Sequence, residues 1–231
     1  AGLREVMPHL RIIGYQHTVV MQSALGMFPT KREVKIKPMP AKILTVGEET
    51  QKILLRYGAY QKEKVEASCA LRYEWLGTSE RRTKIHRNGE VLLALEGVPQ
   101  VVALVDYCVQ EFEAITNCRL RIRTHPELPF SSINGDSHLD LSTKNNVLIS
   151  KDRSLNYDLE QADICIYWGS TVALEALSLG IPLIRFDMLT LFSYDPLIEC
   201  DSLKWKVTQN DQLGPVIESI YLMDHDSFLR E

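Results

Sequence analysis

Residues 162–186 read ADICIYWGSTVALEALSLGIPLIRF and contain the pattern that decides the fold. An apolar run, ICIY, ends at the small residues Gly-Ser-Thr of positions 169–171, and a helical pattern follows until Gly180 and Pro182 end it before a second apolar run. This segment predicts a strand, a turn, a helix and a strand, which is the repeating unit of a parallel α/β sheet. Such a turn places free backbone N–H groups at the carboxyl edge of the sheet, where anionic ligands bind.

The composition is that of an ordinary globular protein. The chain has 231 residues, of which 45% are hydrophobic, and this is enough for a substantial core. The net charge is −4 and the pI is about 5.9, whereas nucleic-acid-binding domains usually carry a basic excess. We therefore expect no nucleic-acid partner.

The cysteines and the apolar runs indicate a reducing, cytoplasmic environment. The chain has five cysteines, an odd number, and no C-x-x-C pair, so we expect reduced thiols and neither disulfides nor a zinc site. No apolar run approaches the roughly 18 residues that a membrane span needs, and no cleavable signal opens the chain. Any membrane contact would then be peripheral.

The first third of the chain predicts one β-α-β unit. A short β-rich run within 10–20 ends at polar residues, AKILTVG at 41–47 is typical of a strand, EETQKILLRYGAY at 48–60 of a helix, and VEASCALRY at 65–73 of the next strand. We interpret residues 1–78 as the C-terminal part of an N-terminal Rossmann-like domain, which the resemblance described below makes the acceptor-side domain.

A charged segment without apolar periodicity separates this unit from a second alternating series. We interpret residues 79–90 as a linker and 91–231 as a complete second Rossmann-like domain. The series has strands expected at 91–97 and 119–126, with a helix at 101–116 between them. After a polar loop at 134–146 come VLISKD, a short helix at 154–162 and the segment quoted above.

The first domain is too small to stand alone. It has about 75 residues, whereas doubly wound domains usually need roughly 100–150. We therefore expect a missing N-terminal segment in cis that precedes Ala1, and an inactive isolated chain. The alternative is one compact domain with a long polar insertion.

The strand RIRTHP brings Arg123, His125 and Pro126 to its carboxyl end, where ligands of open α/β sheets bind. Imidazole can donate a hydrogen bond to a phosphate oxygen. The alternative is a histidine that only tethers its own loop. Glu96 and Gly97 end the preceding strand, and the glycine would let a diphosphate or sugar approach the backbone, unless the pair is a plain turn.

The turn at 169–171 predicts a phosphate site. Ser170 and Thr171 suit helix capping, but capping alone does not need the whole set, and Gly169 allows close approach of a ligand. Glu175 lies about one helical turn further on and could accept hydrogen bonds from a ribose or sugar hydroxyl, or be a solvated acid.

Two further groups carry alternatives. The basic cluster Arg81, Arg82, Lys84, His86 and Arg87 could steer an anionic donor or a lipid-linked acceptor, but a charge run is usually a solvated linker. Trp168 and Trp205 could stack on a base or a sugar, although an aromatic side chain beside a buried strand is more often part of the core.

Residues 123–126 together with 163–182 resemble the donor-nucleotide half of GT-B glycosyltransferases of bacterial surface-polysaccharide biosynthesis. They are most similar to sialyl-, polysialyl- and Kdo-type transferases and to teichoic-acid polymerases, in which an HP motif and an S-S or S-T motif bind the cytidine nucleotide. The run GYQHT at 14–18 and the segment 43–59 also resemble the end of their N-terminal domain. By pattern and order, the resemblance covers most of the chain.

The resemblance implies a GT-B-like α/β fold and a metal-independent glycosyltransferase. It would move a sugar from a nucleotide-sugar, with a CMP-sugar favoured, to a growing cell-surface polysaccharide or lipopolysaccharide such as O-antigen or capsule. The nucleotide-sugar is a substrate, so no cofactor is implied. The acceptor would be a carbohydrate or lipid-linked, and the enzyme cytoplasmic or peripheral to the bacterial inner membrane. The donor phosphate would lie between His125 and the pair Ser170 and Thr171.

Two departures from the family pattern limit the resemblance. Tyr167-Trp168-Gly169 stands where teichoic-acid polymerases carry T-D-Y, and the acidic motif that supplies the base of the sialyl families is not found. His17 is the candidate base and Gln16 an acceptor-side residue. The alternatives are a UDP-sugar 2-epimerase and a non-catalytic nucleotide-binding scaffold domain.

Overall fold

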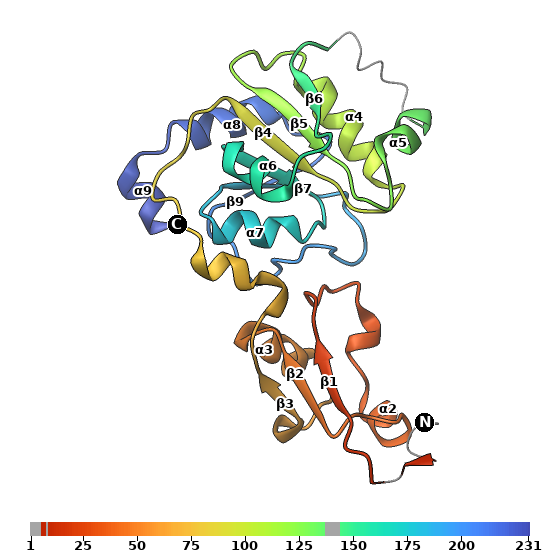
Figure 1. The fold of residues 1–231 in the computed structure, drawn as a ribbon. Helices are drawn as coiled ribbons and strands as arrows, with labels where there is room; N and C mark the ends of the chain where they lie inside the picture. The colour runs from red at the N-terminus through yellow and green to blue at the C-terminus, as the bar shows by residue number, and fades with distance from the viewer. Residues whose placement is uncertain (1–5, 8, 137–143) are drawn as a thin grey trace. The chain divides into compact units, whose positions relative to one another are not determined.

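The structure is a computed structural model that describes residues 6, 7, 9–136 and 144–231. The chain divides into two compact units, Ala1–Thr78 and Ser79–Glu231 (Figure 1). Each unit has its own parallel sheet.

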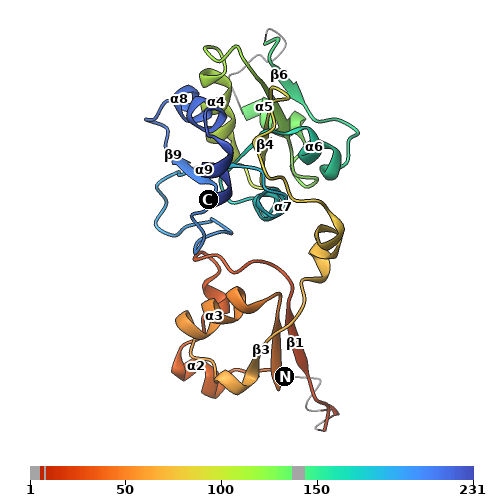
Figure 2. The same cartoon turned by 90° about the vertical axis from the view of Figure 1, so that its left-hand side faces the viewer.

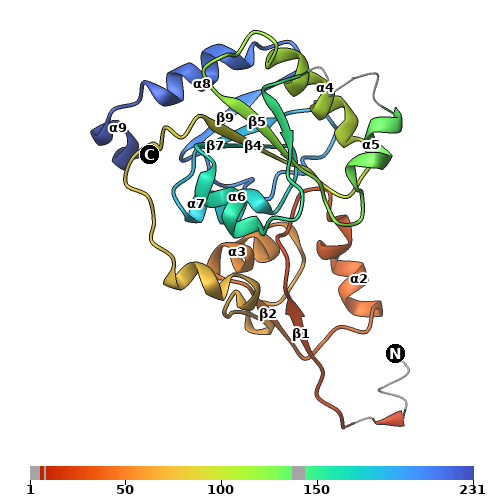
Figure 3. The same cartoon turned by 45° about the horizontal axis from the view of Figure 1, so that its top comes forward.

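The first unit contains a three-stranded parallel sheet in the order β1-β2-β3. Its small core comprises Val20, Leu54 and Val65, and α3 packs against β2 and β3 (Figure 3). The helix α2 begins with a capping box, in which the Thr30 hydroxyl and the Glu33 carboxylate each accept the other's backbone N–H. The elements are β1 (Ile13–Gln16), η1 (Leu25–Met27), α2 (Lys31–Ile36), β2 (Lys42–Thr45), α3 (Glu48–Tyr57), η2 (Lys62–Lys64), β3 (Val65–Ala67) and η3 (Leu71–Thr78).

The strand expected at 65–73 is shorter than the sequence predicts. It ends at Ala67, because the Tyr15 hydroxyl donates to the Cys69 carbonyl at 2.7 Å and accepts from the Leu71 N–H at 3.3 Å. A side chain from β1 thus takes the backbone groups that a longer strand would offer, and the chain turns into the 3₁₀ segment η3.

The second unit contains a six-stranded, all-parallel sheet in the order β6-β5-β4-β7-β8-β9. Counted from β4, this is the order 3-2-1-4-5-6 of the Rossmann fold, whose topological switch point lies between β4 and β7. The elements are β4 (Glu90–Ala94), α4 (Val101–Glu111), β5 (Arg119–Arg123), α5 (Phe130–Asp136), β6 (Val147–Ile149), α6 (Leu155–Gln161), β7 (Ile164–Tyr167), α7 (Val172–Ser178), β8 (Leu183–Phe186), β9 (Lys204–Val207), α8 (Leu213–Tyr221) and α9 (His225–Arg230).

Helices cover both faces of this sheet. Figure 2 shows α4 and α8 on one side and α6 and α7 on the other. The main core joins Val91 and Leu93 of β4 to α4 and α8, which explains why the apolar side chains of these helices are buried. The carboxyl edge of the sheet, with the turns after β4, β5 and β7, is the edge that the sequence predicts to bind a ligand.

The segment 79–90, expected to be a solvated linker, is instead attached to the second unit. The Arg82 guanidinium donates to the carbonyls of Leu159, Glu160 and Ala162 at 2.5–2.9 Å. The Arg82 carbonyl also lies 2.7 Å from the position of a β-carbon on Gly180, which has φ +74°. The reason is chemical: carbonyls at the end of α6 need donors, and a guanidinium supplies several.

Beyond residue 186, where no elements are predicted from the sequence, the structure contains β9, α8 and α9. It also starts α5 at Phe130, before the polar loop expected at 134–146, of which residues 137–143 lie outside the described residues. Within the described ranges, no helix is long and apolar enough to cross a membrane.

Candidate functional site

Glu96 and Gly169 connect the turns after β4 and β7, on either side of the switch point. The Gly169 N–H donates to Glu96 Oε1 at 2.5 Å. The other carboxyl oxygen of Glu96 is buried and has no hydrogen-bond partner. Burial raises the pKa of Glu96 to about 7, although the neighbouring backbone N–H groups lower it. A carboxyl group with this pKa beside two strand ends is typical of a functional site.

His125 joins the same edge from the turn after β5. A β-carbon on Gly97 would stand 2.6 Å from His125 Nδ1, so the imidazole lies directly on the glycine backbone. Nδ1 accepts from the Glu127 N–H at 3.2 Å, and the His125 carbonyl accepts from the Leu128 N–H at 3.0 Å. In the neutral ring, Nε2 then carries the proton and can donate to a ligand.

The Gly-Ser-Thr turn is built as the sequence indicates, but its hydroxyl groups differ in role. Ser170 is buried and its Oγ accepts from the Val172 N–H at 3.4 Å, whereas Thr171 is the N-cap of α7 without a side-chain cap hydrogen bond. The Gly169 N–H, predicted to be free for a phosphate, is already bonded to Glu96.

Tyr194, which was not predicted from the sequence to lie near this turn, leaves no room for a side chain at Gly169. A β-carbon at position 169 would stand 2.9 Å from both the carbonyl oxygen and the β-carbon of Tyr194. The Tyr194 ring also packs on Trp168, with centroids 4.8 Å apart. Trp168 belongs to the core and the partly buried Trp205 packs against it, in agreement with the simpler of the two interpretations above.

Buried charges anchor the loop that carries Tyr194. Asp195 accepts from the Tyr167 hydroxyl at 2.9 Å and from the Leu197 N–H at 2.9 Å, and it lies 3.3 Å from Lys204 Nζ. Arg185 Nε is 3.4 Å from the same carboxylate. The loop after β8 is therefore held rigidly beside the turn at Gly169.

Glu175 lies in α7 and is only 4% exposed. It faces the interior of the unit, where it and Glu96 both raise the pKa of the buried Cys165 thiol. This burial excludes the solvated acid, whereas the hydrogen bond from a ribose or sugar hydroxyl stays a prediction.

Arg123 reaches the carboxyl edge but its charge is used within the fold. Its Nη1 pairs with Asp158 Oδ2 of α6 at 2.6 Å and donates to the Arg153 carbonyl at 3.1 Å. Asp158 is fully buried and also accepts from the Ser150 hydroxyl. Pro126 is exposed and follows the strand end, as expected.

A pocket of about 410 Å³ lies beside the site, between the start of α4 and the turns after β8 and β9. The sequence analysis did not predict it, because its walls come from segments far apart in the chain. Its lining comprises Gln100, Ala103, Phe186, Asp187, Met188, Leu189, Thr190 and Gln209.

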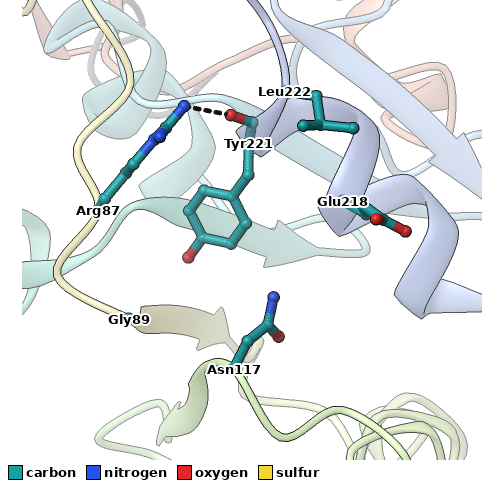
Figure 4. Close-up of a pocket in the computed structure, with 6 residues that line it drawn as sticks. All are labelled: Arg87, Gly89, Asn117, Glu218, Tyr221 and Leu222. Atoms are coloured by element: carbon teal, nitrogen blue, oxygen red, sulfur yellow. Dashed lines mark hydrogen bonds between the residues drawn. The ribbon is translucent and has the colours of Figure 1, made fainter.

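A second pocket, of about 320 Å³, lies at the opposite, amino-terminal edge of the sheet (Figure 4). Arg87 lines it and donates to the Tyr221 carbonyl at 2.8 Å. With Arg82 also bonded to carbonyls, two members of the basic cluster serve the fold at the edge away from Glu96 and His125.

The two candidate residues of the first unit lie at the carboxyl end of β1: Gln16 is its last residue and His17 follows it. His17 is exposed, and Gln16, only 6% exposed, has both side-chain amide atoms buried without hydrogen-bond partners. Gln16 pairs in register with Thr45, at the carboxyl edge of that sheet.

Among the residues that the structure describes, no group of three or more histidines, cysteines or acids could hold a metal ion. All five cysteines are free thiols.

Comparison with solved structures identifies the fold. A Listeria monocytogenes protein assigned as a UDP-N-acetylglucosamine 2-epimerase matches with a TM-score of 0.64 and 14% identity, over 100% of this chain and 63% of its own. The Methanocaldococcus jannaschii UDP-GlcNAc 2-epimerase, in complex with UDP-GlcNAc and UDP, matches with a TM-score of 0.55 and 14% identity, over 83% of this chain and 59% of its own. The glycotransferase of kitacinnamycin matches with a TM-score of 0.53 and 13% identity, over 83% of this chain and 50% of its own. No family model and no curated protein matches the chain in sequence.

These similarities define the class of protein by its fold. The chain has the GT-B-like α/β fold that glycosyltransferases share with UDP-GlcNAc 2-epimerases, as the resemblance implied. It spans only 50–63% of the lengths of these three proteins.

Proposed function

We propose that the protein is a glycosyltransferase of cell-surface polysaccharide or lipopolysaccharide biosynthesis, which takes its sugar from a nucleotide-sugar. One observation carries the proposal: Glu96 with Gly97, His125, and Gly169 with Ser170 come from three strands and meet at the carboxyl edge of the Rossmann sheet. Ligands of open α/β sheets bind at this edge, beside the switch point.

The chemistry of these groups suits a nucleoside monophosphate or diphosphate leaving group, which is CMP from a CMP-sugar and UDP from a UDP-sugar. His125 Nε2 would donate to a phosphate oxygen, and the Ser170 hydroxyl would donate to another. As the anomeric carbon separates from the phosphate, fixed donors would stabilise the charge that develops, which is a form of catalysis that needs no metal ion. The attacking nucleophile would be a hydroxyl of a carbohydrate or lipid-linked acceptor. His17 remains the candidate base and Gln16 the candidate acceptor-side residue.

The sequence motifs and the compared structures favour different donor nucleotides. The HP and S-T motifs resemble those that bind cytidine nucleotides, which favours a CMP-sugar. The Methanocaldococcus jannaschii epimerase that shares the fold was solved with UDP-GlcNAc and UDP. We retain the CMP-sugar as the first donor to test.

Calorimetric titration of the chain with CMP, CDP and UDP tests the donor site. We expect binding of at least one nucleotide, and a loss of at least tenfold in affinity for His125→Ala and Ser170→Ala. His225→Ala and Ser219→Ala are matched controls, because these exposed residues of α9 and α8 lie outside the site. If none of the three nucleotides bound, the donor site would be wrong.

A second candidate function is a UDP-sugar 2-epimerase, which two of the compared structures favour by name. Incubation of the full-length enzyme with UDP-GlcNAc alone distinguishes the two activities. An isomeric sugar nucleotide formed without any acceptor would support the epimerase, whereas a transferase requires an acceptor. A non-catalytic nucleotide-binding scaffold would bind nucleotide and turn over neither substrate.

A further inference from the structure

Glu96 places a carboxyl group where the proposed donor phosphate would come. Its Oε1 accepts the Gly169 N–H at 2.5 Å, and the N–H groups of Trp168 and Ser170 also favour its ionised form. The carboxyl group therefore holds the backbone amides of the turn that a phosphate would otherwise use. An anion that enters this turn meets a second anion unless Glu96 is neutral.

Apart from these backbone N–H groups, the surroundings of Glu96 disfavour its negative charge, because burial outweighs the N–H groups. Its Oε2 is buried without a hydrogen-bond partner. Three titratable groups lie in its surroundings: His125, which packs on the adjacent Gly97, the buried Cys165 of β7, whose pKa Glu96 raises, and Glu175 of α7, which acts on the same thiol. Cys165 and Glu175 cannot supply a positive charge, and His125 is the one member of this set that can. Burial already raises the pKa of Glu96 to about 7, so a proton is available to it at modest cost.

We infer that the donor site takes up one proton when it binds the phosphates of a nucleotide-sugar, and that Glu96 is the residue that takes it. This inference rests on the proposed function. The neutral carboxyl keeps its Oε1 as an acceptor for the Gly169 N–H, so the turn retains its conformation while the charge is removed. A bound phosphodiester anion then stabilises the protonated form, because like charges in a poorly solvated site disfavour each other.

The inference predicts a particular dependence of affinity on pH. Where free Glu96 is mainly neutral, affinity should not change with pH. At higher pH each bound nucleotide must first bring a proton to Glu96, so affinity should fall by up to about tenfold per pH unit. The opposite sign, tighter binding at higher pH, is incompatible with it.

Proton uptake can be measured directly. The chain is titrated at pH 8 with UDP-glucose and with CMP-sialic acid, whose phosphate groups do not titrate near neutral pH, in buffers that differ in ionisation enthalpy. The dependence of the observed heat on that enthalpy gives the number of protons taken up. We expect a value approaching one for the unaltered chain, and a value near zero with pH-independent affinity for Glu96→Gln.

Two variants separate Glu96 from other sources of the proton. His125→Gln should bind more weakly but still take up the proton, whereas loss of uptake in this variant would assign it to His125 and overturn the inference. Glu160→Gln, an exposed residue of α6, should behave as the unaltered chain. Because the unaltered chain reports uptake itself, the inference is tested even if Glu96→Gln fails to fold.

Different results would overturn this inference and the proposed function. Binding of either nucleotide-sugar without proton uptake overturns this inference and leaves the proposed function standing. Absence of binding for both nucleotide-sugars and for the free nucleotides overturns the proposed function, and the inference with it.

Discussion

His125 Nδ1 lies 2.6 Å from the position that a β-carbon on Gly97 would occupy. The imidazole therefore rests on the backbone of the neighbouring turn, and the turns after β4 and β5 form one surface. From the sequence, Gly97 is predicted to let a ligand approach the backbone. The structure gives it another use, because the group that approaches is a side chain of the protein.

Gly97→Ala should displace the imidazole. A contact of 2.6 Å is well inside normal van der Waals distance, so the ring must rotate away and break the hydrogen bond from the Glu127 N–H. Because His125 is exposed, we expect a stability change of only about 1 kcal/mol. Nucleotide affinity should fall about as much as in His125→Ala, measured by calorimetry.

The matched control for this substitution is Gly214→Ala. A β-carbon there would meet Ile115 at 3.6 Å, an ordinary contact, in the first turn of α8. It should bind nucleotide normally. Full affinity in Gly97→Ala would show that the position of His125 does not matter for binding.

The general rule for parallel sheets predicted which turns meet, and it did so well. The turns after β4, β5 and β7 were predicted from apolar runs that stop at Gly97, Pro126 and Gly169. Each of these patterns lies within a few consecutive residues. The contacts between residues far apart in the sequence were not predicted. That Arg123 pairs with Asp158, and that Glu96 bonds Gly169, depends on how neighbouring strands and helices align, which no local pattern contains.

Arg82→Ala should destabilise the second unit by about 2 kcal/mol, because three carbonyls at the end of α6 lose their donor. Urea unfolding, followed by tryptophan fluorescence, measures this. Arg81→Ala is the control, since Arg81 is adjacent and exposed, and it should change stability by less than about 0.5 kcal/mol. Equal effects of the two substitutions would mean that the segment 79–90 behaves as a solvated linker after all.

Asp195→Ala should cost about 3 kcal/mol, because Lys204 and Arg185, whose side chains are only 9% and 14% exposed, lose their shared carboxylate. The loop that carries Tyr194 would also lose its anchor, so nucleotide binding should weaken in parallel. Thermal unfolding and calorimetry report the two effects.

Asp201→Ala provides the comparison for Asp195. Asp201 lies 3.6 Å from the same Lys204 but is fully exposed, so its removal should have little effect on either measurement. A large loss of stability in this variant would show that the lysine, and not the buried network, decides the outcome.

Glu96→Gln should change how stability depends on pH. The pKa of Glu96 is about 7 in the folded chain and 4.5 is its ordinary value, so between these values the native state holds a proton that the unfolded state lacks. The free energy of unfolding contributed by this residue therefore falls as pH rises from 4.5 to 7, and the loss is complete above 7. The glutamine variant has no charge to bury, so it should match the unaltered chain near pH 5 and exceed it by about 3 kcal/mol at pH 8.5. Urea unfolding at the two pH values measures the difference, with Glu160→Gln as the control that should retain the original slope. If Glu96→Gln and the unaltered chain lost stability equally between the two pH values, the carboxyl group of Glu96 would be solvated and ionised throughout, and its burial beside Gly169 could not oppose an incoming phosphate.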